Sequence, residues 1–134
     1  MSEFFEKMFM EAKNARENAH TPYSGFKVGA CLRSESGELF SSGNIENAAY
    51  PNCLCAEAVA VGKLASSGQR EIKEVLVVAD VHGYCAPCGS CRQQIKEFSK
   101  SDTIIHLCNM KGENKTVTMR ELMPYSFSSK TMKS

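Results

Sequence analysis

The sequence lacks three features that would each define a class of protein. No run of apolar residues approaches the ~18 needed to cross a bilayer. Neither sign of charge dominates, because 16 basic and 15 acidic side chains leave a formal net charge of +1, and no basic run is present. Binding to nucleic acid or to a membrane through a strong positive field is therefore not expected. The first residues also lack the basic-then-apolar order of an export signal, so we expect a cytoplasmic protein.

What the chain has is enough apolar material for a core and an unusual number of cysteines. Its 134 residues, 43% of them hydrophobic, fit one domain over residues 1–134 that needs no disulfides. Five of the seven cysteines cluster at positions 53, 55, 85, 88 and 91. In a reducing compartment such clusters more often indicate metal binding or thiol chemistry than a disulfide framework. Cys31 and Cys108 lie inside apolar runs, and we expect both to be buried and inert.

The hydrophobic pattern predicts alternating strands and helices. Helices are predicted over three segments: residues 3–19, where apolar side chains recur at helical spacing, residues 54–66, which are rich in alanine and valine, and residues 88–98, which follow the helix-starting signal Pro87. Strands are predicted over five segments: 26–33, where a two-residue period indicates a half-buried strand, then 39–40, 75–79, 103–108 and 115–119. This order predicts a three-layer α-β-α fold, with a mixed five-stranded sheet and helices on both of its faces.

Two short cysteine boxes carry the chemistry. Cys55-Ala56-Glu57 and, some thirty residues later, Pro87-Cys88-Gly89-Ser90-Cys91 each stand at the predicted start of a helix. Cys88 and Cys91 share one helix face and can bind one ion, to which Cys55 would add a third thiolate. Three protein ligands and one open position are typical of a catalytic zinc site, whereas four ligands are typical of a structural one. Glu57 lies close enough to reach the open position without being a ligand.

A Cys-x-Glu box followed by a Pro-Cys-x-x-Cys box is the signature of zinc deaminases, in which the glutamate moves protons. Hydrolytic deamination adds water to an electron-poor ring carbon and expels ammonia. Zinc can lower the pKa of water from ~15.7 to near 7. A neighbouring carboxylate then takes the proton, places it on a ring nitrogen and later serves the departing amine.

The chain resembles the small, homotetrameric type of cytidine deaminase almost from end to end. Beyond the cysteine boxes, the resemblance rests on the first-strand motif at 23–30, the nucleoside-binding box at 43–50 and the C-terminal motif at 122–127. It implies hydrolysis of cytidine and deoxycytidine in pyrimidine salvage, with one zinc ion in each of four subunits. It also implies that Tyr50 and Phe127 complete the substrate pocket, Phe127 by reaching into a neighbouring subunit.

The resemblance further implies which residues contact the nucleoside. Cys55, Cys88 and Cys91 would hold the metal, and Glu57 would shuttle protons. Four other positions would bind substrate: the side chains of Asn44 and Glu46 at the ribose 3′-hydroxyl, Phe26 against the pyrimidine, and the backbone of Ala56, with that of the Cys88 region, at the pyrimidine edge.

One position departs from the family pattern. Members commonly carry arginine directly after the Cys-Ala-Glu box, where this chain has Ala58. Three thiolates on Zn²⁺ leave a formal charge of −1, which weakens the metal as a Lewis acid. We expect Arg92, directly after Cys91, and the two helix dipoles to balance this charge. An aliphatic residue at position 58 is also similar to blasticidin-S deaminases, which makes that substrate an alternative.

Three other interpretations remain open at this stage. Cys53 or Cys85 could close a four-thiolate shell in a structural zinc or iron–sulfur module, although the cysteine spacing of common clusters is incomplete. Cys88 and Cys91 could form a thioredoxin-like redox pair, which would leave Cys55 unexplained. The substrate could be a base in RNA or DNA, but the balanced charge disfavours this, and Glu46 would repel a 3′-phosphodiester.

Overall fold

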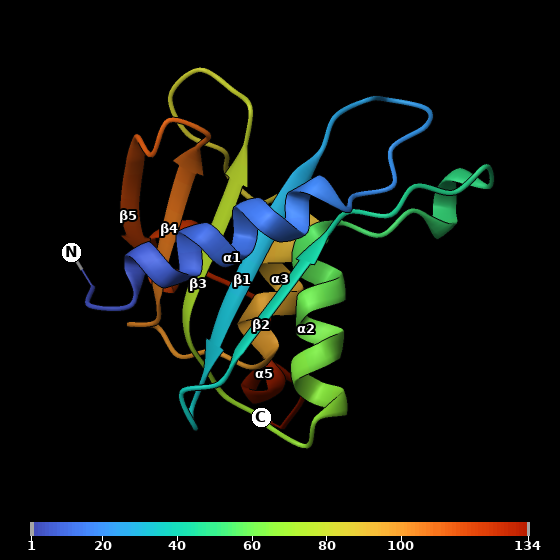
Figure 1. The fold of residues 1–134 in the computed structure, drawn as a ribbon. Helices are drawn as coiled ribbons and strands as arrows, with labels where there is room; N and C mark the ends of the chain where they lie inside the picture. Colours follow the sequence, from blue (N-terminus) through green and yellow to red (C-terminus); the bar gives the residue numbers. More distant parts are fainter. Residues whose placement is uncertain (1, 134) are drawn as a thin grey trace.

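The computed structural model describes residues 2–133 and is built around one five-stranded sheet with the strand order β2-β1-β3-β4-β5 (Figure 1). The strands are β1 (Val28–Ser34), β2 (Leu39–Gly43), β3 (Ile72–Ala79), β4 (Ile104–Asn109) and β5 (Asn114–Thr118). Strand β1 is antiparallel to both β2 and β3, β3 is parallel to β4, and β4 is antiparallel to β5. The sheet is therefore mixed, as the sequence predicts.

Helices cover both faces of this sheet. The longer helices are α1 (Phe5–Glu17), α2 (Ala56–Ser66) and α3 (Gly89–Glu97), and the short ones are η1 (Tyr50–Asn52), α4 (Met119–Leu122) and α5 (Ser129–Lys133). Figure 1 shows α1 crossing one face and α2 and α3 lying behind the other. The predicted three-layer α-β-α architecture is thus confirmed.

Two apolar clusters, one on each face, hold the layers together. Along β3, Leu76 and Val78 pack in the cluster that contains α1, whereas Val75 and Val77 pack in the cluster that contains α2 and α3. All four side chains are fully buried, and burial of each stabilises the fold by about 1.5–3 kcal/mol. A strand buried on both faces explains why this segment reads as a continuous apolar run.

The first strand differs from its prediction. It begins at Val28 rather than at residue 26, and Ala30, Cys31 and Leu32 are all fully buried, so the prediction of a half-buried strand was wrong. The reason is that α1 packs on one face of β1 and α2 on the other. Helix α1 approaches so closely that a Cβ on Gly29 would lie 2.0 Å from the carbonyl oxygen of Ala12. Only glycine fits there.

The remaining sequence predictions hold with smaller corrections. Cys31 and Cys108 are buried, as predicted, and burial raises the pKa of each thiol to about 12, which disfavours the reactive thiolate form. Helix α3 begins at Gly89, so Pro87 lies before the helix rather than at its first position. Helix α2 begins at Ala56, because Leu54 pairs with Ile45 instead. Between residues 2 and 133, no helix combines the length and the hydropathy of a membrane span.

Candidate metal centre

Three cysteine sulfurs meet where two helices begin on the same side of the sheet. The Sγ atoms of Cys55, Cys88 and Cys91 all lie within 4.8 Å of one another, and those of Cys55 and Cys88 are 3.9 Å apart. Thiolates held 2.3 Å from a tetrahedral zinc ion are separated by about 3.8 Å. Both the donor set and its spacing therefore fit zinc.

Helix capping explains why these side chains converge. Cys55 and Cys88 are the residues just before α2 and α3, with extended backbones (ψ of 153° and 167°), and neither sulfur caps its own helix. Cys91 lies in the first turn of α3 and is buried, whereas Cys55 and Cys88 are exposed. Backbone N–H groups at both helix starts favour negative charge on the thiolates.

Contacts within the cluster favour negative charge on Cys55. A hydrogen bond from Cys91, with a weaker contribution from Cys88, lowers the pKa of Cys55 to about 6, and the same contact raises the pKa of Cys91. At neutral pH the cluster thus carries a thiolate, which is the form of cysteine that binds metal.

Glu57 lies in the first turn of α2 and is only 4% exposed. Burial, and secondarily the nearby charge of Cys55, raises the pKa of this carboxyl group to about 7. A group with a pKa near neutrality both accepts and releases protons readily, as general acid–base catalysis requires.

The two other clustered cysteines stand apart from this group. Among residues 2–133, the set of side chains close enough to share one ion contains Cys55, Cys88 and Cys91 alone. Cys85 packs against the apolar core, and burial raises its pKa to about 11. The sulfur of Cys53 accepts a hydrogen bond from the backbone N–H of Asn47 at 3.3 Å. The geometry favours three ligands over a four-thiolate shell.

Asn44, which the sequence assigns to the ribose, braces the loop that carries Phe26. Its Oδ1 atom accepts a hydrogen bond from the backbone N–H of Val28 at 2.9 Å, and its Nδ2 atom donates to the carbonyl oxygen of Phe26 at 3.0 Å. The Phe26 side chain itself is 45% exposed. The second hydrogen of the Asn44 amide group is left for another acceptor.

Glu46 braces the same loop from the other side. Its carboxylate accepts hydrogen bonds from the backbone N–H groups of Tyr23 and Ser24, at 3.0 and 3.1 Å, and from the Ser24 hydroxyl. The Ser24 hydroxyl is the main reason why the pKa of Glu46 is lowered. Sequence reasoning did not single out Ser24, although its place in the Pro22–Gly25 turn was an available signal.

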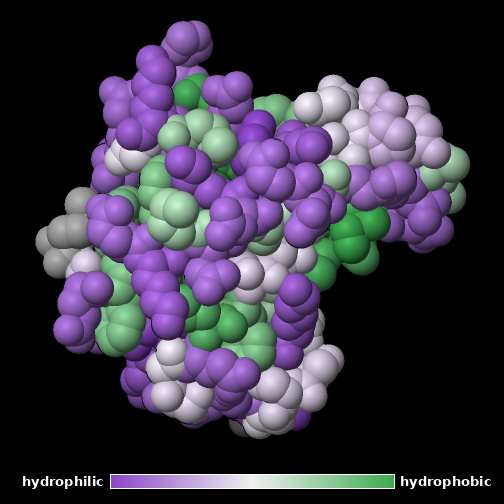
Figure 2. Space-filling model, in the orientation of Figure 1, coloured by the Kyte–Doolittle hydropathy of each residue, from purple (hydrophilic) through white to green (hydrophobic). Residues whose placement is uncertain are grey.

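The aromatic residues expected to complete the pocket lie on exposed segments. Glu46 and Tyr50 line a cavity of about 250 Å³ together with Tyr23, Ser24 and Cys53. Tyr50 belongs to η1, which projects away from the sheet in Figure 1, and it is 73% exposed. Phe127 is 56% exposed. Figure 2 shows hydrophobic surface where the projecting segment leaves the body of the molecule.

Arg92 is held by two backbone carbonyls. Its Nε atom donates to Pro87 at 2.9 Å and its Nη1 atom to Leu122 at 3.0 Å. The Pro87 contact fixes the turn that leads into Cys88, and the Leu122 contact ties α3 to the end of α4. Ala56, fully buried, and Ala58, half-buried, flank Glu57 on α2.

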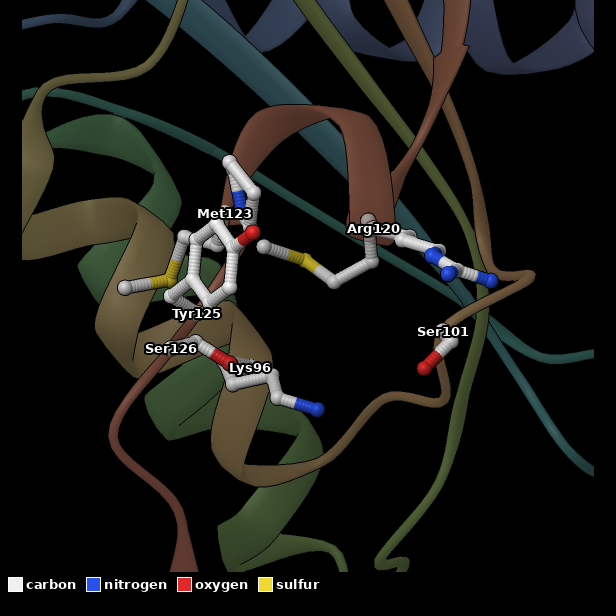
Figure 3. A pocket seen from close by; sticks show the side chains of 8 residues that line it. Lys96, Ser101, Arg120, Met123, Tyr125 and Ser126 are labelled. Atoms are coloured by element: carbon white, nitrogen blue, oxygen red, sulfur yellow. The ribbon is translucent and has the colours of Figure 1, made fainter.

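A larger cavity of about 400 Å³ lies elsewhere (Figure 3). It is lined by Lys96, in the last turn of α3, by residues 101 and 119–120 and by residues 123–126. It therefore lies towards the opposite end of α3 from Cys88 and contains no potential thiolate ligand. A search for the functional site by cavity volume alone would therefore have led away from the cysteine cluster.

Comparison with known proteins agrees with this site. A family model described as the cytidine and deoxycytidylate deaminase zinc-binding region matches residues 2–107. A cytidine deaminase from Sporosarcina psychrophila is 46% identical over 123 residues, which cover 92% of this chain and 90% of that protein. Another, from Halalkalibacterium halodurans, is 40% identical over 127 residues and covers 95% and 96%. The crystal structure of a Burkholderia pseudomallei cytidine deaminase superimposes with a TM-score of 0.88 at 39% identity, covering 95% of this chain and all of that one.

Proposed function

The chain belongs to the cytidine and deoxycytidylate deaminase family, and we propose that it converts cytidine and deoxycytidine to uridine and deoxyuridine, with release of ammonia. The observation that carries this proposal is a buried glutamate, Glu57, two residues from one of three convergent cysteines. In the reaction, the C4–N4 bond of the pyrimidine breaks, an oxygen from water bonds to C4, and the amine leaves as ammonia.

Cys55, Cys88 and Cys91 would hold the zinc ion, with one ion in each subunit. Bound zinc supplies Lewis acidity, which makes water a sufficient nucleophile at neutral pH. The chain provides three sulfur donors from two helix starts, and a three-ligand set of this kind would leave a coordination position for solvent. The exposure of Cys55 and Cys88 leaves the cluster open on the side from which substrate must approach.

Glu57 moves the protons. Its carboxylate takes one proton from the attacking water and delivers it to N3 of the pyrimidine. It then takes the remaining proton from the new C4 hydroxyl and delivers it to N4, so that the C4–N4 bond breaks, C4 keeps a carbonyl oxygen and ammonia leaves. A carboxyl pKa near 7 suits both directions of transfer. Because Glu57 is buried, bulk water cannot compete for the proton at the moment of transfer.

The loop that carries Phe26 forms the nucleoside site. Asn44 and Glu46 hold this loop in place, and their remaining hydrogen-bonding capacity is directed to the ribose 3′-hydroxyl. Phe26 packs against the pyrimidine, and the backbone at Ala56 and Cys88 reads its edge. A carboxylate at the 3′-hydroxyl favours a free nucleoside over a polynucleotide. Asn44, Glu46 and Phe26 together favour cytidine over blasticidin S.

The working form is a homotetramer with shared active sites. Tyr50 and Phe127 are large aromatic side chains that lie mostly in solvent in a single subunit, and exposed aromatic patches commonly mark subunit interfaces. Phe127 completes the pocket of a neighbour. We further propose that residues 1–134 act as one catalytic domain in pyrimidine salvage, in the reducing cytoplasm, where metal-binding thiols stay reduced.

The direct test is an ultraviolet assay of purified protein with cytidine, deoxycytidine, cytidine monophosphate, adenosine and blasticidin S, together with zinc quantitation. We expect turnover of the two cytosine nucleosides and about one zinc ion per chain. Turnover of blasticidin S alone would replace the proposed substrate. Stoichiometric zinc with no turnover of any substrate would indicate a structural metal site.

A further inference from the structure

The C-terminal strap, defined as residues 122–127, runs beside α3, which contains Cys91 and begins directly after Cys88. In Figure 3, Met123, Tyr125 and Ser126 of the strap lie beside the helix of Lys96, and all four residues line one cavity. Two consecutive residues of α3 bind the two ends of the strap. Arg92 Nη1 donates to the carbonyl oxygen of Leu122 at 3.0 Å, and Gln93 Nε2 donates to that of Phe127 at 3.1 Å.

Between these two anchors the strap contains a strained bend. Tyr125 has a φ of 57°, and it is the one non-glycine residue with positive φ in the part of the chain that the structure describes. Residues with side chains rarely adopt this conformation and keep it only when their surroundings enforce it. Tyr125 is fully exposed, so packing of its own side chain cannot enforce this backbone conformation. The chain on either side of the bend is held instead: Leu122 and Met123 pack against the core, and α3 binds the carbonyl oxygens of Leu122 and Phe127.

Phe127 lies two residues after the bend. Its carbonyl oxygen faces α3, where Gln93 binds it, whereas its side chain is 56% exposed. We propose that Gln93 is a positioning residue: together with Arg92 it holds the strained bend, so that the Phe127 ring is presented to the substrate pocket of a neighbouring subunit. This inference rests on the proposed function. Under this proposal, α3 contributes a metal ligand to the pocket of its own subunit and positions an aromatic side chain for the pocket of a neighbouring subunit.

The test replaces the donor without changing its shape. Gln93→Glu puts a carboxylate oxygen where Nε2 donates, so it loses the hydrogen bond and repels the Phe127 carbonyl. Gln94→Glu is the matched control, because this substitution introduces the same charge one position along α3. The Gln94 side chain donates to Ser90 Oγ within the helix rather than to the strap. Gln93→Ala, which adds no charge, is the second variant should Gln93→Glu fold poorly.

We expect Gln93→Glu to raise KM for cytidine by roughly 2- to 10-fold, the value of one hydrogen bond, with kcat nearly unchanged and zinc content retained. Gln94→Glu should leave all three unchanged. Chymotrypsin should also cleave after Phe127 roughly 2- to 10-fold faster in Gln93→Glu than in the control. Adding Tyr125→Gly to Gln93→Glu removes the strain from the bend and should recover most of the lost affinity.

The cycle with Phe127→Ala decides whether Gln93 acts through that side chain. In the Phe127→Ala background, Gln93→Glu should have no further effect on KM. The proposal is overturned by an equal KM increase in both backgrounds, by loss of zinc from Gln93→Glu, or by faster proteolysis with unchanged KM. A wild-type protein that does not deaminate cytidine would refute the proposed function instead, while the proteolysis comparison would still report on the strap.

Discussion

The sulfur of Cys55 lies 3.9 Å from that of Cys88, although 33 residues separate the two positions. Each cysteine is the last residue before a helix, so the distance between them is set by how α2 and α3 pack. Leu64 of α2 and Ile95 of α3 are both fully buried in the same apolar cluster. The metal geometry is therefore a property of the core rather than of the loops.

Cys88→Ser should release most of the zinc, whereas Cys85→Ser should retain it. The first change removes a sulfur from the convergent group, and the second alters a side chain that packs in the core. Turnover of Cys88→Ser should fall by more than the ~10- to 100-fold typical of losing an outer-shell partner. Metal content and kcat/KM of both purified variants provide the measurement. Loss of zinc from Cys85→Ser would indicate a fourth thiolate ligand.

Glu57→Gln should keep its zinc and lose nearly all turnover. Glutamine has the shape of glutamate but cannot take a proton from water, and positioned proton transfer contributes about 10²–10⁴-fold to rate. Glu6→Gln, on the exposed side of α1, makes the same chemical change far from the cysteines and should behave as wild type. Steady-state kinetics with metal analysis distinguish the two. A Glu57→Gln variant with wild-type kcat would remove Glu57 from the mechanism.

Periodicity, a continuous apolar run at 75–79 and the helix-start signal at Pro87 were together enough to predict the sheet and its three main helices. The short elements η1, α4 and α5 were missed, because one turn carries too little periodicity to recognise. Helix α4 did offer a signal, a capping box in which Thr118 and Glu121 bind each other's backbone N–H groups. The burial of both faces of β1 was also missed, since the small residues Gly29 and Cys31 do not reveal that α1 lies over them.

The cysteine cluster was predictable because its spacing and its helix-start positions are local features. Interactions between distant segments were not predictable. The sequence places Asn44 and Glu46 in a binding box, but it gives no sign that both brace the loop at residues 23–28. Nor does it show that Gln93 reaches Phe127, 34 residues later. Such pairings depend on the packed fold and leave no periodic pattern.

Arg92→Gln and Arg92→Lys should differ if Arg92 balances the charge of the thiolates. Lysine keeps the positive charge but cannot bind the Pro87 and Leu122 carbonyls in the same forked geometry. We expect Arg92→Gln to lower kcat by roughly 10-fold or more, and Arg92→Lys to lower it less. Adding Ala58→Arg to Arg92→Gln should restore part of the loss. Equal effects of both Arg92 variants would assign Arg92 to anchoring alone.

A buried polar network on the α1 face of the sheet, opposite the face that α2 and α3 cover, supports the last prediction. Glu74, fully buried in β3, accepts hydrogen bonds from Ser2 at 3.0 Å and Arg33 at 3.1 Å, and its Oε2 atom lies 2.5 Å from Nε2 of the buried His106. Burial alone would raise the pKa of Glu74, but the hydrogen bonds, that of His106 foremost, outweigh it, so the pKa is lowered from its ordinary value of 4.5.

Glu74→Gln should therefore destabilise the protein at neutral pH and much less in acid. Because the pKa of Glu74 is lower in the folded state, the stability it contributes is present above the unfolded value of 4.5 and is lost as the pH falls through the folded value. We expect Glu74→Gln to lower the free energy of unfolding by about 2 kcal/mol at pH 7, since hydrogen bonds to charged groups contribute about 1.5–3 kcal/mol.

Urea unfolding at pH 7 and near pH 3 measures the difference in stability from wild type, and zinc release in acid affects both proteins alike. Glu71→Gln is the control: it removes a partly exposed carboxylate that pairs with the exposed Lys73 and Lys100, and it should change stability little at either pH. A Glu74→Gln deficit that stays constant or grows as the pH falls would show that the carboxylate does not stabilise the fold through its charge.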